Sequence, residues 1–284
     1  MDFKNKIDYH IHSEYSFDVY GVDKQVRIFD ICETALKKGL TQIAITDHYD
    51  INTVEQGFIM GLDFESRRRD IIRAKKAYEG KLKVLCGIEL GQPHQVPEKA
   101  KQILKENKFD YVIASYHNNV DVPDFYILDY PNIDRQLLVQ YYEDYLCQTI
   151  DHIKWGIGRI STLGHLGYPI RYYIRNGLGG ILNPYDPKYM KITKEIFNLL
   201  IKNDIALEVN TSGWRQGMNN SMAFDGMVQY YIDMGGKLLT VGSDSHTLDN
   251  VGDDIDKQYG ILYKMGVKNI TAFESGKPYF VDIV

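Results

Sequence analysis

The sequence has few cysteines, and they are not placed as a framework. Its 284 residues include Cys32, Cys86 and Cys147. An odd number without a CxxC pair is not typical of disulfide-stabilised folds or of zinc fingers. We therefore expect three buried thiols in a reducing compartment, and a cytoplasmic location.

Long apolar runs and an excess of one charge are also missing. No stretch approaches the roughly 18 apolar residues that span a bilayer, and Lys4, Lys6 and Asp8 interrupt the place where a signal peptide has its apolar core. The 33 basic and 38 acidic residues give a formal net charge of −5, which does not indicate a nucleic-acid-binding face. We expect a small-molecule partner, and neither a membrane nor a nucleic acid; the oligomeric state stays open.

Short apolar runs alternate with longer segments of helical spacing. The runs cover residues 7–13, 42–47, 83–91, 111–116, 160–166, 206–211 and 238–242, and the helical segments cover 26–38, 65–78, 133–154, 189–202, 221–234 and 254–265. This alternation predicts parallel strands with helical crossovers, in an open sheet or a closed barrel. No GxGxxG follows the first run, which disfavours a dinucleotide-binding fold. Without a linker in the sequence, we expect one domain over residues 1–284.

Two longer connections, residues 118–132 and 168–187, are rich in Tyr, Asp, Asn and Pro. Long connections in compact domains are often binding loops or lids. We expect both to border the functional site.

Six of the eight histidines stand at the ends of the predicted strands. These strand ends present His10, His12, His48, Glu89, His117, His165, Asp244 and His246. In a parallel barrel all carboxyl ends of the strands share one rim, so these side chains should converge. Residues i and i+2 of a strand point to one face, which pairs His10 with His12 and Asp244 with His246. Imidazole and carboxylate ligands in this number predict two or three divalent ions, of Zn, Mn or Fe type.

Other polar residues receive a structural interpretation. A single histidine is more often a hydrogen-bonding residue than a metal ligand, and we assign His152 to packing or surface. His94 follows Glu89 in a loop, where it could line the pocket, and we give it no role. Asp47 should point away from its neighbour His48 as a structural group. The run Arg67-Arg68-Arg69 lies among acidic residues in a helical segment, which predicts a solvated helix face.

At these residues the sequence resembles the PHP superfamily (polymerase and histidinol phosphatase) over essentially the whole chain. The resemblance rests on the ordered motifs HxH, TDH, GxE, SxH, GH and GSDSH. It implies an α/β fold, a distorted (β/α)7 TIM-like barrel, with three divalent metal ions. One ion is implied to bind His10, His12, Glu89 and Asp244; the second Glu89, His117 and His165; the third Asp18, His48 and His246. Asp18 is assigned by the resemblance alone.

Within the superfamily, residues 164–173 and 208–215 are similar to stand-alone histidinol phosphatases. This implies hydrolysis of L-histidinol phosphate to L-histidinol and phosphate in histidine biosynthesis, by a metal-bound hydroxide, with Glu89, Asp244 and His246 as catalytic groups. Arg171 and Arg215 match phosphate-binding positions, and a guanidinium suits a phosphate dianion. Asp121, Asp124 or Asp129 could balance the charge of the histidinol imidazole and amine, and the sequence does not identify a general acid.

Three other functions remain open. A PHP phosphoesterase could act on another phosphomonoester or a nucleotide, which a substrate panel would reveal. A metal-dependent amidohydrolase also begins with HxH, but commonly bridges its metals with a modified lysine, where this sequence has Glu89. A non-catalytic barrel could dispense with the ligand set, and elemental analysis would then find no bound transition metal.

Overall fold

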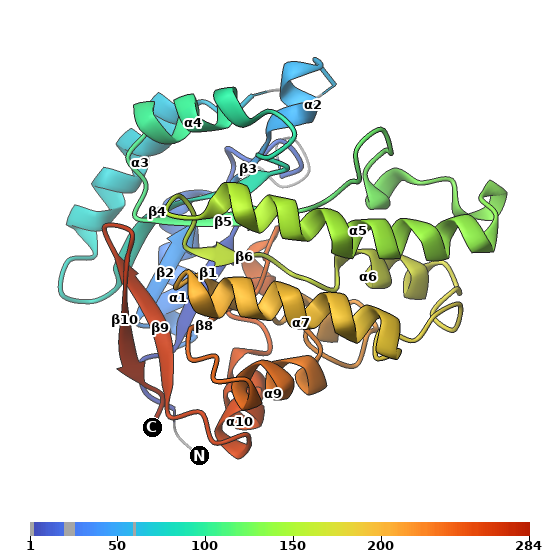
Figure 1. Ribbon diagram of the computed structural model, residues 1–284. Coiled ribbons are helices and arrows are strands. Elements are labelled where there is room, and N and C mark those ends of the chain that lie inside the picture. Colours follow the sequence, from blue (N-terminus) through green and yellow to red (C-terminus); the bar gives the residue numbers. More distant parts are fainter. Residues whose placement is uncertain (1–2, 20–25, 59–60) are drawn as a thin grey trace.

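A ring of parallel strands organises the molecule. The computed structural model describes residues 3–19, 26–58 and 61–284. Within them, seven parallel strands are hydrogen-bonded in the order β1-β2-β4-β5-β6-β7-β8 (Figure 1). Their bounds are β1 Ile7–Ile11, β2 Gln42–Ile45, β4 Lys83–Gly91, β5 Tyr111–Ser115, β6 Thr162–Leu163, β7 Ala206–Asn210 and β8 Leu239–Gly242. A parallel bridge from Ile11, the last residue of β1, to Ser245, three residues after β8, brings the two ends of the sheet together. The predicted α/β barrel is confirmed.

Helices connect the strands on the outside of the barrel (Figure 1). The longer ones are α1 Ile28–Lys37, α3 Phe64–Ala77, α4 Pro97–Glu106, α5 Arg135–Gly156, α7 Pro187–Lys202, α9 Asp225–Asp233 and α10 Ile255–Lys264. The shorter ones are α2 Ile51–Glu55, α6 Tyr168–Arg175, α8 Ser212–Arg215 and the 3₁₀ turns Phe125–Ile127, Tyr130–Asn132 and Leu248–Asn250. Asp134 caps α5 by accepting a hydrogen bond from the Gln136 amide. Each predicted helical segment is present within a few residues; α4 and the short helices were not predicted.

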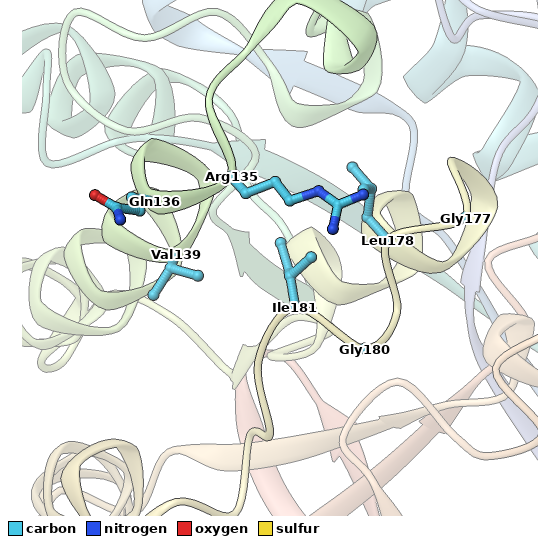
Figure 2. Close-up of a pocket in the computed structure, with 7 residues that line it drawn as sticks. All are labelled: Arg135, Gln136, Val139, Gly177, Leu178, Gly180 and Ile181. Atoms are coloured by element: carbon cyan, nitrogen blue, oxygen red, sulfur yellow. The ribbon is translucent and has the colours of Figure 1, made fainter.

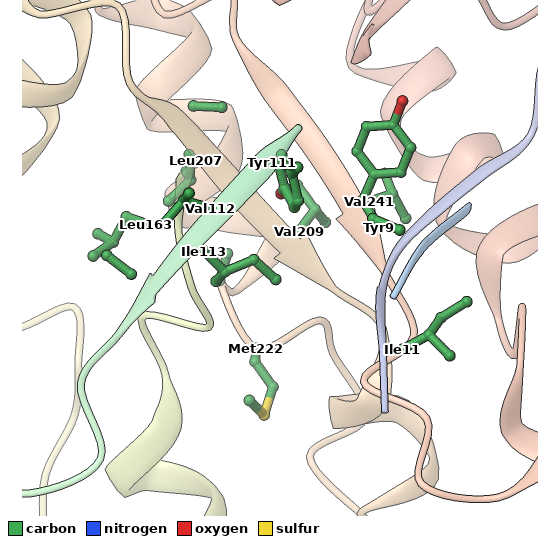
Figure 3. Close-up of a cluster of buried hydrophobic side chains, with 14 of the residues drawn as sticks. Tyr9, Ile11, Tyr111, Val112, Ile113, Leu163, Leu207, Val209, Met222 and Val241 are labelled. Carbon is green, nitrogen blue, oxygen red and sulfur yellow. The ribbon is translucent and has the colours of Figure 1, made fainter. Parts of the chain in front are cut away.

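Apolar side chains of the strands form the core of the barrel. Figure 3 shows Ile113 of β5, Leu207 and Val209 of β7 and Val241 of β8 among the buried apolar side chains, together with Met222 from a loop. Strands of a parallel sheet are covered on both faces, so they read as almost continuous apolar runs. This is why the strand positions could be predicted from the sequence.

A C-terminal hairpin, β9 (Asn269–Glu274) and β10 (Lys277–Asp282), lies at the end of the barrel where the strands begin. Thr271 accepts a hydrogen bond from the amide of Leu239, the first residue of β8, and Phe273 packs against Tyr111 at the start of β5. In Figure 1 the arrow of β6 points away from this hairpin. The hairpin, which was not predicted, leaves the opposite rim for a site.

The prediction of a solvated face is wrong for Arg67. Its side chain is 1% exposed and donates to the Asp47 carboxylate and to the carbonyl oxygens of Ile45 and Gly87, both at 2.6 Å. Asp47 also accepts from the amide and hydroxyl of Ser13. The structural interpretation of Asp47 is thereby confirmed, because it fixes α3 and the loop after β1 to the barrel.

The cysteines and the two remaining histidines have structural surroundings. Cys32 and Cys86 are buried, but Cys147 is exposed on α5, so the prediction of a third buried thiol is wrong. His152 is buried in α5, with its Nδ1 3.1 Å from Nδ1 of His94, which confirms a packing role. Among the described helices, none is both long enough and apolar enough to span a membrane.

Candidate metal centre

The strand ends bring the predicted histidines together around Glu89. His10 comes from β1, and His12 directly follows that strand. The short strand β3 (His48–Asp50) pairs with β4 so that His48 lies beside Glu89. His117 follows β5 and His165 follows β6, and the Nε2 atoms of these two rings are 3.4 Å apart.

The two carboxylate oxygens of Glu89 face two different sets of imidazoles. Oε1 lies 2.8 Å from Nε2 of His165 and 3.2 Å from Nε2 of His117. Oε2 lies 2.8 Å from Nδ1 of His48, 3.1 Å from Nε2 of His10 and 3.4 Å from Nε2 of His12. Burial works against ionisation, yet the imidazoles of His48 and His10 hold the pKa of Glu89 well below its usual range. Glu89 is therefore placed to bridge two cations.

Two aspartates complete the arrangement. Oδ1 of Asp244 lies 3.4 Å from Nε2 of His12 and 3.6 Å from Nε2 of His10. Oδ2 of Asp18 lies 2.7 Å from Nε2 of His246 and 3.4 Å from Nε2 of His48. Every ligand predicted from the sequence thus belongs to at least one group of close donor atoms: His12-Asp18-His48-His246, His10-Glu89-His165, His10-His12-Asp244 or His48-Asp50-His117.

Several of these potential metal-ligand atoms make no hydrogen bond. Within the described residues, Nε2 of His10, Nε2 of His12, Nδ1 of His48 and Oε2 of Glu89 are buried, and the short contacts among them do not have the geometry of hydrogen bonds. Buried polar atoms are normally paired, because leaving them unpaired costs free energy. Cations between these atoms would satisfy them together, so the residues present fit divalent metal ions.

The closeness of Asp244 and His246 has a different origin from the one predicted. β8 ends at Gly242, and Asp244 adopts a left-handed conformation with φ of 53° rather than that of a strand. Asp tolerates this region better than most residues other than glycine. Arg215 donates to the carbonyl oxygens of Ser243 and Asp244, at 2.6 Å each. A turn held by Arg215, and not strand periodicity, positions these two side chains.

Two carboxylates behind the histidines were not predicted. Oε1 of Glu208, in β7, lies 2.6 Å from Nδ1 of His10, and Oδ1 of Asp50 lies 2.7 Å from Nδ1 of His117. Such partners fix the tautomer and orientation of a metal-binding imidazole. A Cβ on Gly242 would come within 2.4 Å of the His10 Cβ and 2.9 Å of Glu208 Oε1, so glycine is needed there. An acidic residue inside the apolar run 206–211 was the signal for Glu208.

A Glu208→Gln variant should bind metal about 10- to 100-fold more weakly than the wild type, because the amide cannot replace the charged partner of His10. The amide oxygen can still accept the hydrogen bond from the His165 backbone, so folding should persist. Competition with a zinc-binding dye would measure the affinity. Unchanged affinity would show that Glu208 does not tune the imidazole.

A cavity of about 320 Å³ opens beside the clustered ligands. Its wall includes Arg171, Tyr168 and Tyr172 from α6 and Asp124 from the connection after β5. Both long connections therefore border the site, as predicted, although the second begins with a helix. The Arg171 guanidinium lies over the rings of Tyr168 and Tyr172, with Nη1 3.4 Å from Oδ2 of Asp244.

A larger hollow lies elsewhere, between the start of α5 and the segment after α6 (Figure 2). Its volume is about 560 Å³, and it is lined by Arg135, Gln136, Val139, Gly177, Leu178, Gly180 and Ile181. These residues include a single charged side chain and none of the predicted site residues. The chemistry expected from the sequence is therefore concentrated in the smaller cavity.

Known proteins share this architecture over nearly the whole chain. A histidinol-phosphatase of Lactococcus lactis is 25% identical over 96% of both chains, and a probable histidinol-phosphatase of Clostridium acetobutylicum is 27% identical over 86% of this chain and 88% of its own. The crystal structure of the Lactococcus lactis histidinol phosphate phosphatase, complexed with zinc, L-histidinol and phosphate, matches with a TM-score of 0.73 at 23% identity, over 97% of this chain and 99% of that one.

A putative histidinol phosphatase of Listeria monocytogenes matches with a TM-score of 0.71 at 16% identity, over 89% of this chain and 99% of that one. The structural matches agree with the barrel described above. The pattern of the PHP domain matches residues 8–212, which include every predicted ligand except Asp244 and His246. The chain therefore belongs to the PHP domain family.

Proposed function

We propose that this chain is a metal-dependent phosphomonoesterase that hydrolyses L-histidinol phosphate to L-histidinol and phosphate. The observation that carries the proposal is the placement of Arg171 on the wall of the same cavity that the metal-ligand groups border. A guanidinium next to bound cations suits a phosphate dianion. The relatives of similar length that are named histidinol-phosphatases support this choice of substrate.

Three divalent ions of Zn, Mn or Fe type fit the proposal. His10, His12, Glu89 and Asp244 would hold the first, Glu89, His117 and His165 the second, and Asp18, His48 and His246 the third. Such ions, when bound, lower the pKa of water toward neutrality and neutralise charge on phosphoryl oxygens.

The residues of the chain would contribute orientation and charge. Arg171 would bind phosphoryl oxygens with two parallel N–H groups, and its stacking on Tyr168 and Tyr172 limits the positions that it can adopt. Glu208 and Asp50 would hold His10 and His117 in one tautomer. Preorganised charge of this kind supplies most of the catalysis in phosphoryl transfer.

Phosphate release from a panel of monoesters tests the proposal. The metal-loaded protein should turn over L-histidinol phosphate with a kcat/KM at least about 100-fold higher than for glycerol phosphate, p-nitrophenyl phosphate or nucleoside monophosphates. Chelator should abolish the activity, and added Zn, Mn or Fe should restore it. A preference for a nucleotide would instead favour another PHP phosphoesterase.

Arg171→Ala should raise KM for phosphate monoesters about 10- to 100-fold, because a charge-assisted pair with phosphate is lost. Arg171→Lys should recover only part of this, since lysine cannot bind two oxygens in parallel. Steady-state kinetics measure both.

Arg215→Ala should also weaken phosphate binding if Arg215 has the proposed second phosphate role. Its bonds to the Ser243 and Asp244 carbonyls predict a lower melting temperature as well. A lower melting temperature with unchanged KM would leave Arg215 a structural role only.

A further inference from the structure

Of the three aspartates that could balance the charge of the histidinol amine, Asp124 is the one that lines the cavity. Asp124 precedes the 3₁₀ turn Phe125–Ile127, and its Oδ1 accepts from the Tyr126 amide at 2.7 Å and from the Tyr168 hydroxyl at 2.9 Å. Its Oδ2 makes no hydrogen bond to the described residues. The other aspartates of the cavity wall, Asp18, Asp50 and Asp244, all belong to the groups of metal-ligand atoms. Asp124 is therefore the carboxylate left to meet a substrate.

A short path of hydrogen bonds connects Asp124 to the phosphate-binding arginine. Nη2 of Arg171 donates to the Tyr172 hydroxyl at 2.6 Å, and this hydroxyl donates to the Tyr168 hydroxyl at 3.3 Å. The Tyr168 hydroxyl then donates to Asp124. Each step passes through a single oxygen atom, so Arg171 and Asp124 are separated by no more than the combined length of these contacts. A molecule with a phosphate and a cation a few bonds apart can reach both.

The path also fixes the position of Asp124. The Tyr168 ring packs against the rings of His117 and His165, at 4.7 and 5.0 Å between centroids. Tyr168 thereby holds the carboxylate at a set place relative to the metal-ligand groups. Burial raises the pKa of the Asp124 carboxyl, with His117 acting in the opposite direction. A cation that arrives at this poorly solvated carboxylate would stabilise its ionised form.

We propose that Oδ2 of Asp124 binds the primary ammonium group of the substrate and so selects phosphate monoesters that carry an amine two carbons from the ester oxygen. This inference rests on the proposed function and makes it more specific. L-Histidinol phosphate has such an amine, whereas glycerol phosphate and nucleotides do not. The metal-ligand groups and Arg171 would serve any phosphate monoester, and Asp124 would supply the discrimination.

The test compares L-histidinol phosphate with its deamino analogue, 3-(imidazol-4-yl)propyl phosphate, in the metal-loaded wild type and in Asp124→Asn. We expect the wild type to favour the amine about 10- to 100-fold in kcat/KM, as for a charged hydrogen bond. The variant should lose this preference through a higher KM for the amine, while its kinetics on the deamino analogue stay within about twofold. The amide oxygen of Asn can still accept the bonds from Tyr126 and Tyr168, so the wall should persist.

Asp121→Asn is the matched control, because Asp121 is exposed in the same connection and should keep the wild-type preference. Equal losses on both substrates in Asp124→Asn would overturn the proposal, and so would an unchanged preference. Ethanolamine phosphate and ethyl phosphate form a second pair without imidazole. If the wild type fails to favour L-histidinol phosphate in the panel, this second pair remains informative. A preference for ethanolamine phosphate over ethyl phosphate that is lost in Asp124→Asn then still supports the ammonium site. No such preference would overturn it.

Discussion

Replacing Glu89 with Gln should remove bound metal and lower kcat/KM for phosphate monoesters. The loss should be far larger than the roughly 10- to 100-fold loss that follows when a residue that only hydrogen-bonds a metal ligand is replaced. The reason is geometric: the two oxygens of Glu89 face two sets of imidazoles, at 2.8 Å from His165 on one side and from His48 on the other. The neutral amide offers one oxygen and less charge, so it cannot bridge two cations. Elemental analysis and phosphate release measure the two losses.

The Glu89 experiment needs a control for charge and for folding. Glu79→Gln makes the same chemical change at an exposed position two residues after α3 and should keep full metal content and activity. Circular dichroism of Glu89→Gln with chelator, compared with the wild type under the same conditions, separates metal loss from misfolding. A folded Glu89→Gln protein with full metal content and wild-type turnover would contradict the proposed ligand set.

Arg67→Met should lower the free energy of unfolding by about 3–5 kcal/mol. The substitution leaves the Asp47 carboxylate buried without its cation, and it leaves the carbonyl oxygens of Ile45 and Gly87 without their donor. Methionine fills similar space, so the loss reports the ion pair more than a cavity. Denaturant unfolding of the metal-free protein measures it without a contribution from bound ions.

Two further variants make the Arg67 prediction specific. Arg68→Met, on the exposed side of the same helix, should change stability by no more than about 0.5 kcal/mol. Adding Asp47→Asn to Arg67→Met should restore part of the loss, because no unpaired charge then remains buried. Additive losses in the double variant would mean that the two side chains do not act as a pair.

The barrel and the residues around Glu89 could be predicted because both follow from local pattern. A buried parallel strand reads as an apolar run, and residues at its carboxyl end face one rim whatever the details of packing. His10, His12, His117 and His165 therefore had to approach one another once the runs had been placed. The same reasoning reached Asp244 and His246, although the backbone there turns.

The partners of these residues could not be predicted in the same way. The sequence does not show which side chains Glu208 and Asp50 meet, and it does not choose Asp124 over Asp121 or Asp129. Arg67 looks in the sequence like part of a basic helix face. Their roles depend on which side chain from a distant segment they meet, as in the contacts of Glu208 with His10 and of Arg67 with Asp47.

By itself, the sequence determined the alternation of strand and helix and the set of imidazoles and carboxylates at the strand ends. Only the tertiary structure decided the direction of each side chain: Glu89 between two groups of histidines, Arg215 on the backbone of a turn, and Asp124 joined to Arg171 through two tyrosines. The physical reason is the separation along the chain over which each effect acts. Periodicity acts over a few residues, whereas a buried charge is positioned by whichever partner the folded chain brings within hydrogen-bonding distance.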